Sequence, residues 1–294
     1  MSTTIRRRWH RLGTVGVLAA GALLFGSLTP GLAVPAAADP GEVNDRKVIA
    51  KMLESEDHAM GSQVRKHEDV ESGLFERHEY LSPEDVGARA TVAGIDVSSH
   101  QRNVNWQSYW DQGKRFAYVK ATEGTSYRNP YFAQQYNGSY GIGMIRGAYH
   151  FARPNVSSGA VQANYFVDHG GGWSADGKTL PGALDIEYNP YGGTCYGVSA
   201  AGMVAWIKEF SDTYHARTGR WPTIYTTTNW WSRCTGNQGD FSSTNPLWVA
   251  RYAHAPGALP FRWRIYTFWQ YSSYPVDQNI FNGGYNRLQA LATG

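Results

Sequence analysis

The sequence predicts an α/β protein whose main part is a closed, TIM-barrel-like β/α barrel of about eight strands. Three observations predict this class. From residue 92 onward, short apolar runs alternate with helix-like stretches, which is typical of parallel strands joined by helical crossovers. About eight such runs fall within roughly 200 residues, which favours a closed barrel over an open sheet. Hydrophobic residues make up 42% of the 294 residues, enough for a sizeable core.

The strand-like runs include "VAGIDV", "FAYVKAT" and "GALDIE". The clearest helix spans 199–219, where Ser199 is a candidate N-cap, Gly219 a C-terminal stop, and an apolar face repeats at helical spacing. The barrel is short for its class, so we expect some helices to be short or missing. The full set of expected strands is 92–97, 116–122, 144–152, 182–187, 223–227, 247–252, 267–272 and 276–281, and further helices are expected near 104–113, 129–140 and 158–169.

Residues 1–38 have the organisation of a secretory signal peptide. Four arginines, Arg6, Arg7, Arg8 and Arg11, precede an apolar run over 15–28, and "AAA" at 36–38 is a small-residue cleavage site. We therefore expect a secreted, extracellular protein without a membrane span in its mature form. The arginines leave open whether export follows the general or the twin-arginine route.

Residues 39–90 differ in charge from the rest of the chain. They hold 13 acidic and 7 basic residues, whereas residues 91–294 hold 11 acidic and 16 basic residues. A charge change of this kind marks a boundary between an acidic segment and a catalytic barrel at 91–294. Two interpretations stay open for 39–90: a retained linker, or a pro-segment that covers the basic barrel until it is removed.

Two carboxylates stand near the end of one expected strand, in "GALDIEYNP". Asp185 and Glu187 are two positions apart, so in a strand they share a face with Ala183 and lie about 6.6 Å apart along it. Leu184 and Ile186 point to the opposite face, toward helices. Catalytic residues of α/β barrels lie at the carboxyl ends of strands, and a pair of carboxylates suits glycoside hydrolysis. The pair therefore predicts a glycosidase site.

Two further aspartates fit the same arrangement. Asp96 ends the first expected strand and Asp277 begins the last, so closing the barrel brings them side by side. Glu123, in "KATEG", is expected to pair with Lys120 or a nearby arginine and to be structural.

Seven segments together resemble glycoside hydrolase family 25, the Chalaropsis-type lysozymes. They are "GIDVSSHQ", "FAYVKATEGTSYRNPYF", "GAYHFARP", "ALDIEYN", "PTIYTT", "LWVARY" and "FWQYSS…VDQNIFNG", in order from about residue 93 to 284. The resemblance implies an irregular, flattened β/α barrel. It also implies an N-acetylmuramidase that cleaves the β-1,4 bond between N-acetylmuramic acid and N-acetylglucosamine in peptidoglycan.

The resemblance also implies roles for the carboxylates. Glu187 is the general acid, and Asp185 is the anion that stabilises charge at the anomeric carbon, by orienting the substrate's 2-acetamido group or by assisting water attack. Asp96 and Asp277 position groups around the sugar and help hold Glu187 protonated. "VSSHQ" departs from the "VSHWQ" of many members and puts no catalytic residue in doubt.

Aromatic residues are abundant, with 11 Trp and 19 Tyr. Those on or just after strands are candidates to stack on sugar rings, although core packing is an equal alternative for each of them. The candidate substrate-binding residues are Tyr149, Tyr188, Tyr225, Trp248 and Trp269. The basic excess of the barrel suits the anionic cell wall.

Cys195 and Cys234 are the two cysteines of the chain. In an oxidising compartment a disulfide is expected between them. Each follows a predicted strand, so the bridge is expected to join two loops on the catalytic face.

Three other functions are alternatives. A chitinase-like enzyme carries a further Asp where this chain has Ala183. A metal-dependent hydrolase would use Asp96, His100, His150 and Asp185, but these lack a metal-binding spacing; no metal or cofactor is expected. A non-catalytic glycan-binding barrel would not need the acids. The net charge of +3 is too small to indicate nucleic acid, and we expect a monomer acting on peptidoglycan glycan strands.

Overall fold

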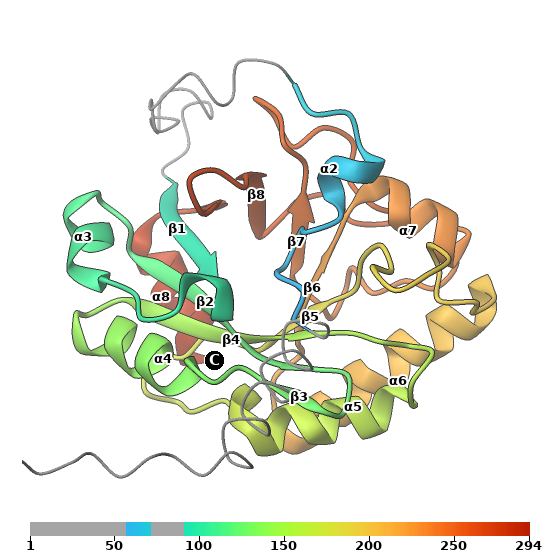
Figure 1. Ribbon diagram of the computed structural model, residues 1–294, viewed down its shortest axis with the longest axis horizontal. Helices are drawn as coiled ribbons and strands as arrows, with labels where there is room; N and C mark the ends of the chain where they lie inside the picture. The colour runs from blue at the N-terminus through green and yellow to red at the C-terminus, as the bar shows by residue number, and fades with distance from the viewer. Residues whose placement is uncertain (1–56, 72–90) are drawn as a thin grey trace, which may run out of the picture. The chain divides into compact units, whose positions relative to one another are not determined.

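The computed structural model describes residues 57–71 and 91–294 (Figure 1). The signal peptide expected at 1–38, and residues 39–56 and 72–90 of the acidic segment, lie outside the described residues. The strands are β1 (Val92–Val97), β2 (Phe116–Glu123), β3 (Tyr127–Arg128), β4 (Ile145–Phe151), β5 (Ala183–Asp185), β6 (Thr223–Thr226), β7 (Leu247–Ala250), β8 (Phe268–Ser272) and β9 (Asp277–Phe281).

Eight of these strands form a closed barrel. They follow one another in the order β1-β9-β8-β7-β6-β5-β4-β2, and β1 pairs with β2 to close the ring. The short β3 pairs with the end of β2 and adds nothing to the closure. The predicted barrel of about eight strands is confirmed, and all eight expected strands are present with small differences at their ends.

One part of the topology differs from the expected parallel arrangement. Strand β9 runs antiparallel to both of its neighbours, β8 and β1, whereas the other barrel pairs are parallel. The cause is the connection between β8 and β9, which has only the residues 273–276. A link this short cannot hold a crossover helix, so it reverses the chain direction.

Most of the helices lie around the outside of this barrel, while buried residues of the first and the last helix join the cluster inside it (Figure 1). Three of the four expected helices are shorter than their predicted ranges, while α6 agrees with its prediction. The helices are α2 (Val64–His67), η1 (Ser99–Gln101), α3 (Trp106–Asp111), α4 (Phe132–Gly141), α5 (Gly159–Phe166), η2 (Val167–Gly171), α6 (Ala200–Thr218), α7 (Thr228–Thr235) and α8 (Tyr285–Thr293).

Helix α6 shows why its ends were predictable. The Ser199 hydroxyl accepts a hydrogen bond from the Gly202 N–H, and Gly219 ends the helix with a positive φ of 73°. A left-handed residue at this place favours glycine. The buried side chains of the helix include Met203, Ile207 and Phe210, as the spacing indicated. Helices α7 and α8 were not expected from the sequence.

The residues of β5 alternate between two of the three apolar clusters of the described chain. Ala183 belongs to the cluster inside the barrel, together with Tyr118 and Phe268. Leu184 and Ile186 belong to a second cluster, outside the strands, which also contains residues of α5, α6 and α7. This confirms the predicted facing of the strand that carries Asp185. None of the helices in the described part of the chain is long and apolar enough to cross a membrane.

Candidate active site

Four buried carboxylates meet at the mouth of the barrel. Asp185 is the last residue of β5, and Glu187 follows two residues later; both are fully buried. The strand was expected to reach residue 187, but its ladder ends at Asp185. The Ile186 N–H still bonds the carbonyl of Tyr225 at 3.0 Å, which keeps the chain extended toward Glu187.

Asp96 and Asp277 are direct partners in the antiparallel pair of β1 and β9. The barrel thus brings these two side by side, as the sequence predicted. Oδ2 of Asp96 accepts hydrogen bonds from Gln270 at 2.9 Å and from Asn279 at 2.7 Å. Burial raises the pKa of Asp96 to about 7, and the hydrogen bonds from Asn279, Gln270 and Asp277 oppose part of that rise.

Glu187 has the properties of a carboxylic acid that keeps its proton near neutral pH. Burial raises its pKa to about 8, backbone N–H groups of Gly61 and Gln63 oppose the rise, and the charge of Asp96 adds to it. The Gly61 N–H lies 2.7 Å from Oε1. The other oxygen, Oε2, has no hydrogen-bond partner among the described residues.

Asp185 lies in a different electrostatic setting. Burial raises its pKa well above the ordinary value, the charge of Glu187 adds to the rise, and Lys120 opposes it. Within residues 57–71 and 91–294, neither carboxylate oxygen of Asp185 has a hydrogen-bond partner. Asp185 is therefore the member of the pair that faces a neighbouring cation and keeps both oxygens available to a ligand.

Lys120 is a buried cation beside the carboxylates, which the sequence indicated only as a partner of Glu123. Its Nζ lies 2.6 Å from Oε2 of Glu123, so the expected pairing is confirmed. Burial alone would raise the pKa of Glu123. The charge of Lys120 and the hydrogen bonds from His58 outweigh burial and lower this pKa to about 2. The sequence could have indicated this cation through the lysine in the apolar run "FAYVKAT", because a buried lysine needs anionic partners.

Gln270 and Asn279 were also missed. Both are fully buried polar residues on the last two strands, and both donate to Asp96. Tyr225 donates to the Gln270 side-chain oxygen at 2.7 Å. The signal was their alternation with apolar residues in "FWQYS" and "DQNIF", which places amides on the same face as Asp277.

The five candidate sugar-binding aromatics do not all lie near the carboxylates. Tyr149 and Tyr225 lie inside the barrel, and the pKa of each hydroxyl is raised by burial, with the charge of Asp185 contributing. Tyr188 follows Glu187 directly. Trp248 lies deeper in the barrel, where its indole N–H bonds Asn279 at 2.9 Å. Trp269 belongs to the cluster outside the strands, on the face of β8 opposite Gln270, so the structure does not bring it to the carboxylates.

The histidines weighed as metal ligands do not converge on the carboxylates. His150 is buried outside the barrel between Phe166 and Phe210, and it bonds Thr122 and Gln162. His100 lies after β1 and bonds a backbone carbonyl. In the parts of the chain that the structure describes, no three His, Cys, Asp or Glu residues are grouped as metal ligands would be.

Comparison with known proteins matches this site to one family. The sequence profile described as Glycosyl hydrolases family 25 covers residues 95–280, a range that contains all four carboxylates. The chain belongs to glycosyl hydrolases family 25. The family expected from the sequence is therefore confirmed, and with it the assignment as a glycoside hydrolase.

The relatives of this family 25 hydrolase differ in how much of the chain they match. An N,O-diacetylmuramidase of Chalaropsis sp. is 54% identical over 211 residues, which are 69% of this chain and all of the relative. The muramidase structure from Acremonium alcalophilum is 56% identical, with a TM-score of 0.68, and covers 69% of this chain and 99% of its own. Lysozyme M1 of Streptomyces globisporus is 44% identical over 298 residues, covering 99% of this chain and 97% of the relative.

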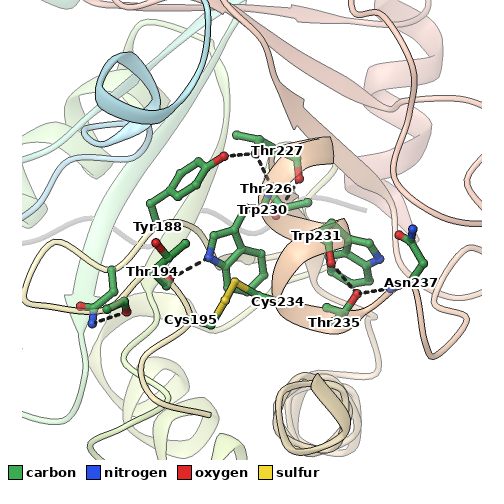
Figure 2. Close-up of a disulfide and its surroundings, with 12 residues drawn as sticks. Tyr188, Thr194, Cys195, Thr226, Thr227, Trp230, Trp231, Cys234, Thr235 and Asn237 are labelled. Atoms are coloured by element: carbon green, nitrogen blue, oxygen red, sulfur yellow. Dashed lines mark hydrogen bonds between the residues drawn. A yellow bond between two sulfur atoms is a disulfide. The ribbon is translucent and has the colours of Figure 1, made fainter. Parts of the chain in front are cut away.

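The family 25 hydrolase carries the expected disulfide between Cys195 and Cys234 (Figure 2). Cys195 lies in the loop after β5, as predicted. Cys234 lies in α7 rather than in a loop, because the chain after β6 turns directly into that helix. The Trp230 indole N–H donates to the carbonyl of Thr194 at 3.2 Å beside the bridge. The disulfide therefore ties the loop that follows Glu187 to a helix.

Replacing both cysteines by serine should lower the free energy of unfolding. The bridge closes a loop with a sequence separation of 39 residues, for which the chain-entropy relation gives about 4 kcal/mol. Denaturant unfolding of the double variant measures the loss. Activity should fall as well, because the loop after Glu187 then loses its covalent link to α7. If both stability and activity match the wild type, the bridge has no role in holding this loop.

Proposed function

We propose that this chain is a peptidoglycan hydrolase, an N-acetylmuramidase that cleaves the β-1,4 bond between N-acetylmuramic acid and N-acetylglucosamine with Glu187 as its general acid. One observation carries the proposal: a fully buried glutamic acid with a pKa raised to about 8 lies beside a second buried carboxyl at the mouth of a family 25 barrel. The relatives named muramidase or lysozyme support the substrate.

Glu187 protonates the oxygen of the leaving sugar. A general acid has to carry its proton at the pH of the reaction and release it as the bond breaks. Burial provides the first condition, because the raised pKa keeps the carboxyl neutral near pH 7. A free glutamate with its ordinary pKa of about 4.3 would hold little proton there.

Asp185 acts as the anion that faces the anomeric carbon. As the glycosidic bond breaks, positive charge develops on the sugar, and a carboxylate beside it lowers the barrier. Burial and the Glu187 charge raise the pKa of Asp185, and Lys120 opposes part of that rise; the anionic role of Asp185 is the one that the family resemblance implies for it. The carboxylate can orient the substrate's 2-acetamido oxygen for attack or assist a water molecule; its charge serves both routes.

Asp96 and Asp277 act on the proposed acid through their charges and do not contact the sugar in this proposal. The charge of Asp96 raises the pKa of Glu187, and Gln270 and Asn279 hold Asp96 in place through its Oδ2. Asp277, paired with Asp96 across the strands, has a pKa raised by burial and by the Asp96 charge. These two residues are thus positioning residues that act through Glu187.

Replacing Asp96 by Asn should move the alkaline limb of the pH–activity profile to lower pH. Removing the Asp96 charge removes an interaction that raises the Glu187 pKa, so Glu187 loses its proton at lower pH and the acid form disappears earlier. The amide oxygen of Asn can still accept from Gln270 and Asn279, which preserves the local hydrogen bonds. The measurement is kcat/KM against pH for both proteins. An alkaline limb that stays in place, or moves upward, would contradict this role.

Among the candidate aromatics, Tyr188 is the best placed as a sugar platform. Tyr188 directly follows Glu187 in the chain. The ring of His67 stacks on one face of the Tyr188 ring, with 4.3 Å between the ring centroids. A face that accepts a flat ring accepts the apolar face of a pyranose. Tyr149 and Tyr225 lie beside Asp185 at the bottom of the site, and Trp248 supports Asn279 beneath them.

We further propose that the protein is exported, that its signal peptide is 1–38, and that it acts outside the cell as a monomer on glycan strands. The function is tested by comparing substrates. Purified peptidoglycan should yield new reducing ends with this protein, and chitin should not, because the position of the further chitinase aspartate is Ala183. Cleavage of chitin at a similar rate would contradict the proposed substrate.

A further inference from the structure

Residues 57–71 form a segment that lies against the mouth of the barrel (Figure 1, blue). We call these residues the N-terminal segment. Met60 and Val64 are buried in the cluster inside the barrel, next to Tyr149, Tyr225 and Tyr252. The N-terminal segment is therefore packed into the catalytic site itself.

The centre of the N-terminal segment is bonded to the proposed general acid. The Gly61 N–H donates to Oε1 of Glu187 at 2.7 Å, and the Gln63 N–H also acts on this carboxyl. The Gly61 carbonyl accepts from Tyr252 at 3.2 Å. Two N–H donors stabilise the carboxylate form of Glu187, whereas the reaction needs the protonated form next to a sugar oxygen. The backbone of Gly61 thus occupies the Glu187 carboxyl oxygen that a sugar oxygen would approach, while burial still keeps the pKa of Glu187 raised to about 8.

The start of the N-terminal segment engages Lys120. Asp57 lies 2.9 Å from Nζ of Lys120, and the carbonyl of His58 accepts from the same nitrogen at 2.7 Å. The His58 N–H donates to Glu123 at 3.0 Å. Lys120 is the cation that opposes the pKa rise of Asp185. The segment therefore bonds Glu187 directly and acts on Asp185 only through Lys120.

The end of the N-terminal segment covers the opposite side of the site. His67 stacks on Tyr188, whose hydroxyl donates to Glu68 at 2.6 Å. Further along, Glu71 lies 3.3 Å from the guanidinium of Arg251 and accepts from the His254 N–H at 3.0 Å. The segment therefore runs from the end of β2 across Glu187 to the loop after β7.

We propose that the N-terminal segment is an intramolecular inhibitor, which fills the catalytic site of the intact chain and has to leave before a glycan strand can enter. This inference rests on the proposed muramidase function. Of the two interpretations of residues 39–90, the inhibitor proposal favours a pro-segment that is removed over a retained linker. Release requires a cut between Glu71 and Thr91, so the active form should begin beyond Glu71.

Charge and the relatives agree with an added inhibitor. The N-terminal segment holds four acidic and two basic residues, while the barrel has a basic excess, so the two attract each other. The Chalaropsis and Acremonium relatives are each matched almost end to end by 69% of this chain, about the share that residues 91–294 make up. A family 25 barrel is therefore complete without such a segment.

Gly61 provides a specific test, because no other residue fits at its position. Its φ is +74°, and an added Cβ would lie 2.4 Å from the Tyr252 hydroxyl and 2.5 Å from the Gln270 side-chain oxygen. Gly61→Val should therefore expel the segment through both backbone strain and overlap. We expect the uncut variant to be about 100-fold more active than the uncut wild type, as for an equilibrium moved from mostly closed to mostly open.

Lys66→Val is the matched control. Lys66 is exposed, and its ammonium group bonds Gln63 within the same segment. Lys66→Val introduces the same side chain five residues away without entering the barrel, and the uncut protein should stay inactive. If Gly61→Val and wild type are equally active before any cut, the segment does not inhibit.

Cutting the chain gives the second arm of the experiment. A specific protease sequence is placed within residues 72–90, the protein is cut, and the released N-terminal piece is removed by gel filtration. Activity should rise about 100-fold on removal. A synthetic peptide of residues 57–71 should then inhibit the freed barrel and bind it in calorimetry, whereas the Gly61→Val peptide should do neither.

The outcomes separate this inference from the proposed function. If the freed barrel binds the peptide but does not cleave peptidoglycan, the muramidase proposal fails and the docking of the segment stands. If the freed barrel cleaves peptidoglycan at the rate of the uncut chain and the peptide has no effect, the function stands and the inhibitor proposal fails.

Discussion

Replacing Glu187 by Gln should reduce peptidoglycan hydrolysis by about 10³-fold or more, since positioned general acids contribute up to about 10⁴-fold. The amide keeps the size of the carboxyl and can still accept the hydrogen bond that Gly61 donates to Oε1. It has no acidic proton to give to the leaving sugar. The measurement is kcat on purified peptidoglycan, with the variant and wild type in the same processed form.

The fold of this variant is checked by its circular dichroism and thermal midpoint, which should match the wild type. Glu209→Gln is the matched control, because Glu209 lies exposed on α6 and makes the same chemical change far from the barrel mouth. It should keep full activity. A Glu187→Gln protein that retains a tenth or more of the wild-type rate would remove Glu187 from the role of acid.

Replacing Asp185 by Asn should reduce kcat by about 10²- to 10³-fold, the range seen when one preorganised electrostatic contact to the transition state is removed. The effect should be mainly on kcat, with little change in KM, because the carboxylate acts on charge that develops only as the bond breaks. Asp212→Asn, at an exposed ion pair with Lys208 on α6, is the matched control.

The Asp185 variant also separates stability from catalysis. Burial and the Glu187 charge raise the Asp185 pKa, so removing one of two neighbouring buried acids should leave stability unchanged or slightly higher. A loss of activity accompanied by equal or greater stability therefore indicates a catalytic role. A loss that follows unfolding would assign Asp185 to the structure instead.

Much of the barrel was predictable because its signals are local. Alternating apolar runs mark each strand, and Ser199 and Gly219 mark the ends of α6 through side-chain capping and a left-handed turn. The direction of β9 was missed, since it depends on the length of the connection to β8 rather than on the strand's own residues. Helix α7 was missed because the chain turns into it directly after β6, where the sequence predicted a loop.

The candidate site was predictable to the extent that strand geometry controls it. The facing of Asp185 and the meeting of Asp96 with Asp277 follow from alternation and barrel closure. The aromatic side chains did not follow in the same way. Trp269 and Gln270 are neighbours, yet one packs against helices and the other bonds Asp96; only the register of β8 decides which of them faces inward.

The N-terminal segment was beyond sequence reasoning for a different reason. Its composition indicated only a charge difference from the barrel. Its contact with Glu187 comes from backbone N–H groups, those of Gly61 and Gln63, and backbone groups leave no mark in a sequence. The requirement for glycine at this position is the one trace that the contact leaves.

The most direct measurement of the central claim is the identity of the sugar at the new reducing ends after digestion of purified peptidoglycan. The digest is reduced with borohydride and its muropeptides are analysed by mass spectrometry. Acid catalysis by Glu187 in an N-acetylmuramidase predicts reduced N-acetylmuramic acid at every new end, and no new ends with Glu187→Gln. Reduced N-acetylglucosamine at the new ends would contradict the account, because the enzyme would then be a glucosaminidase.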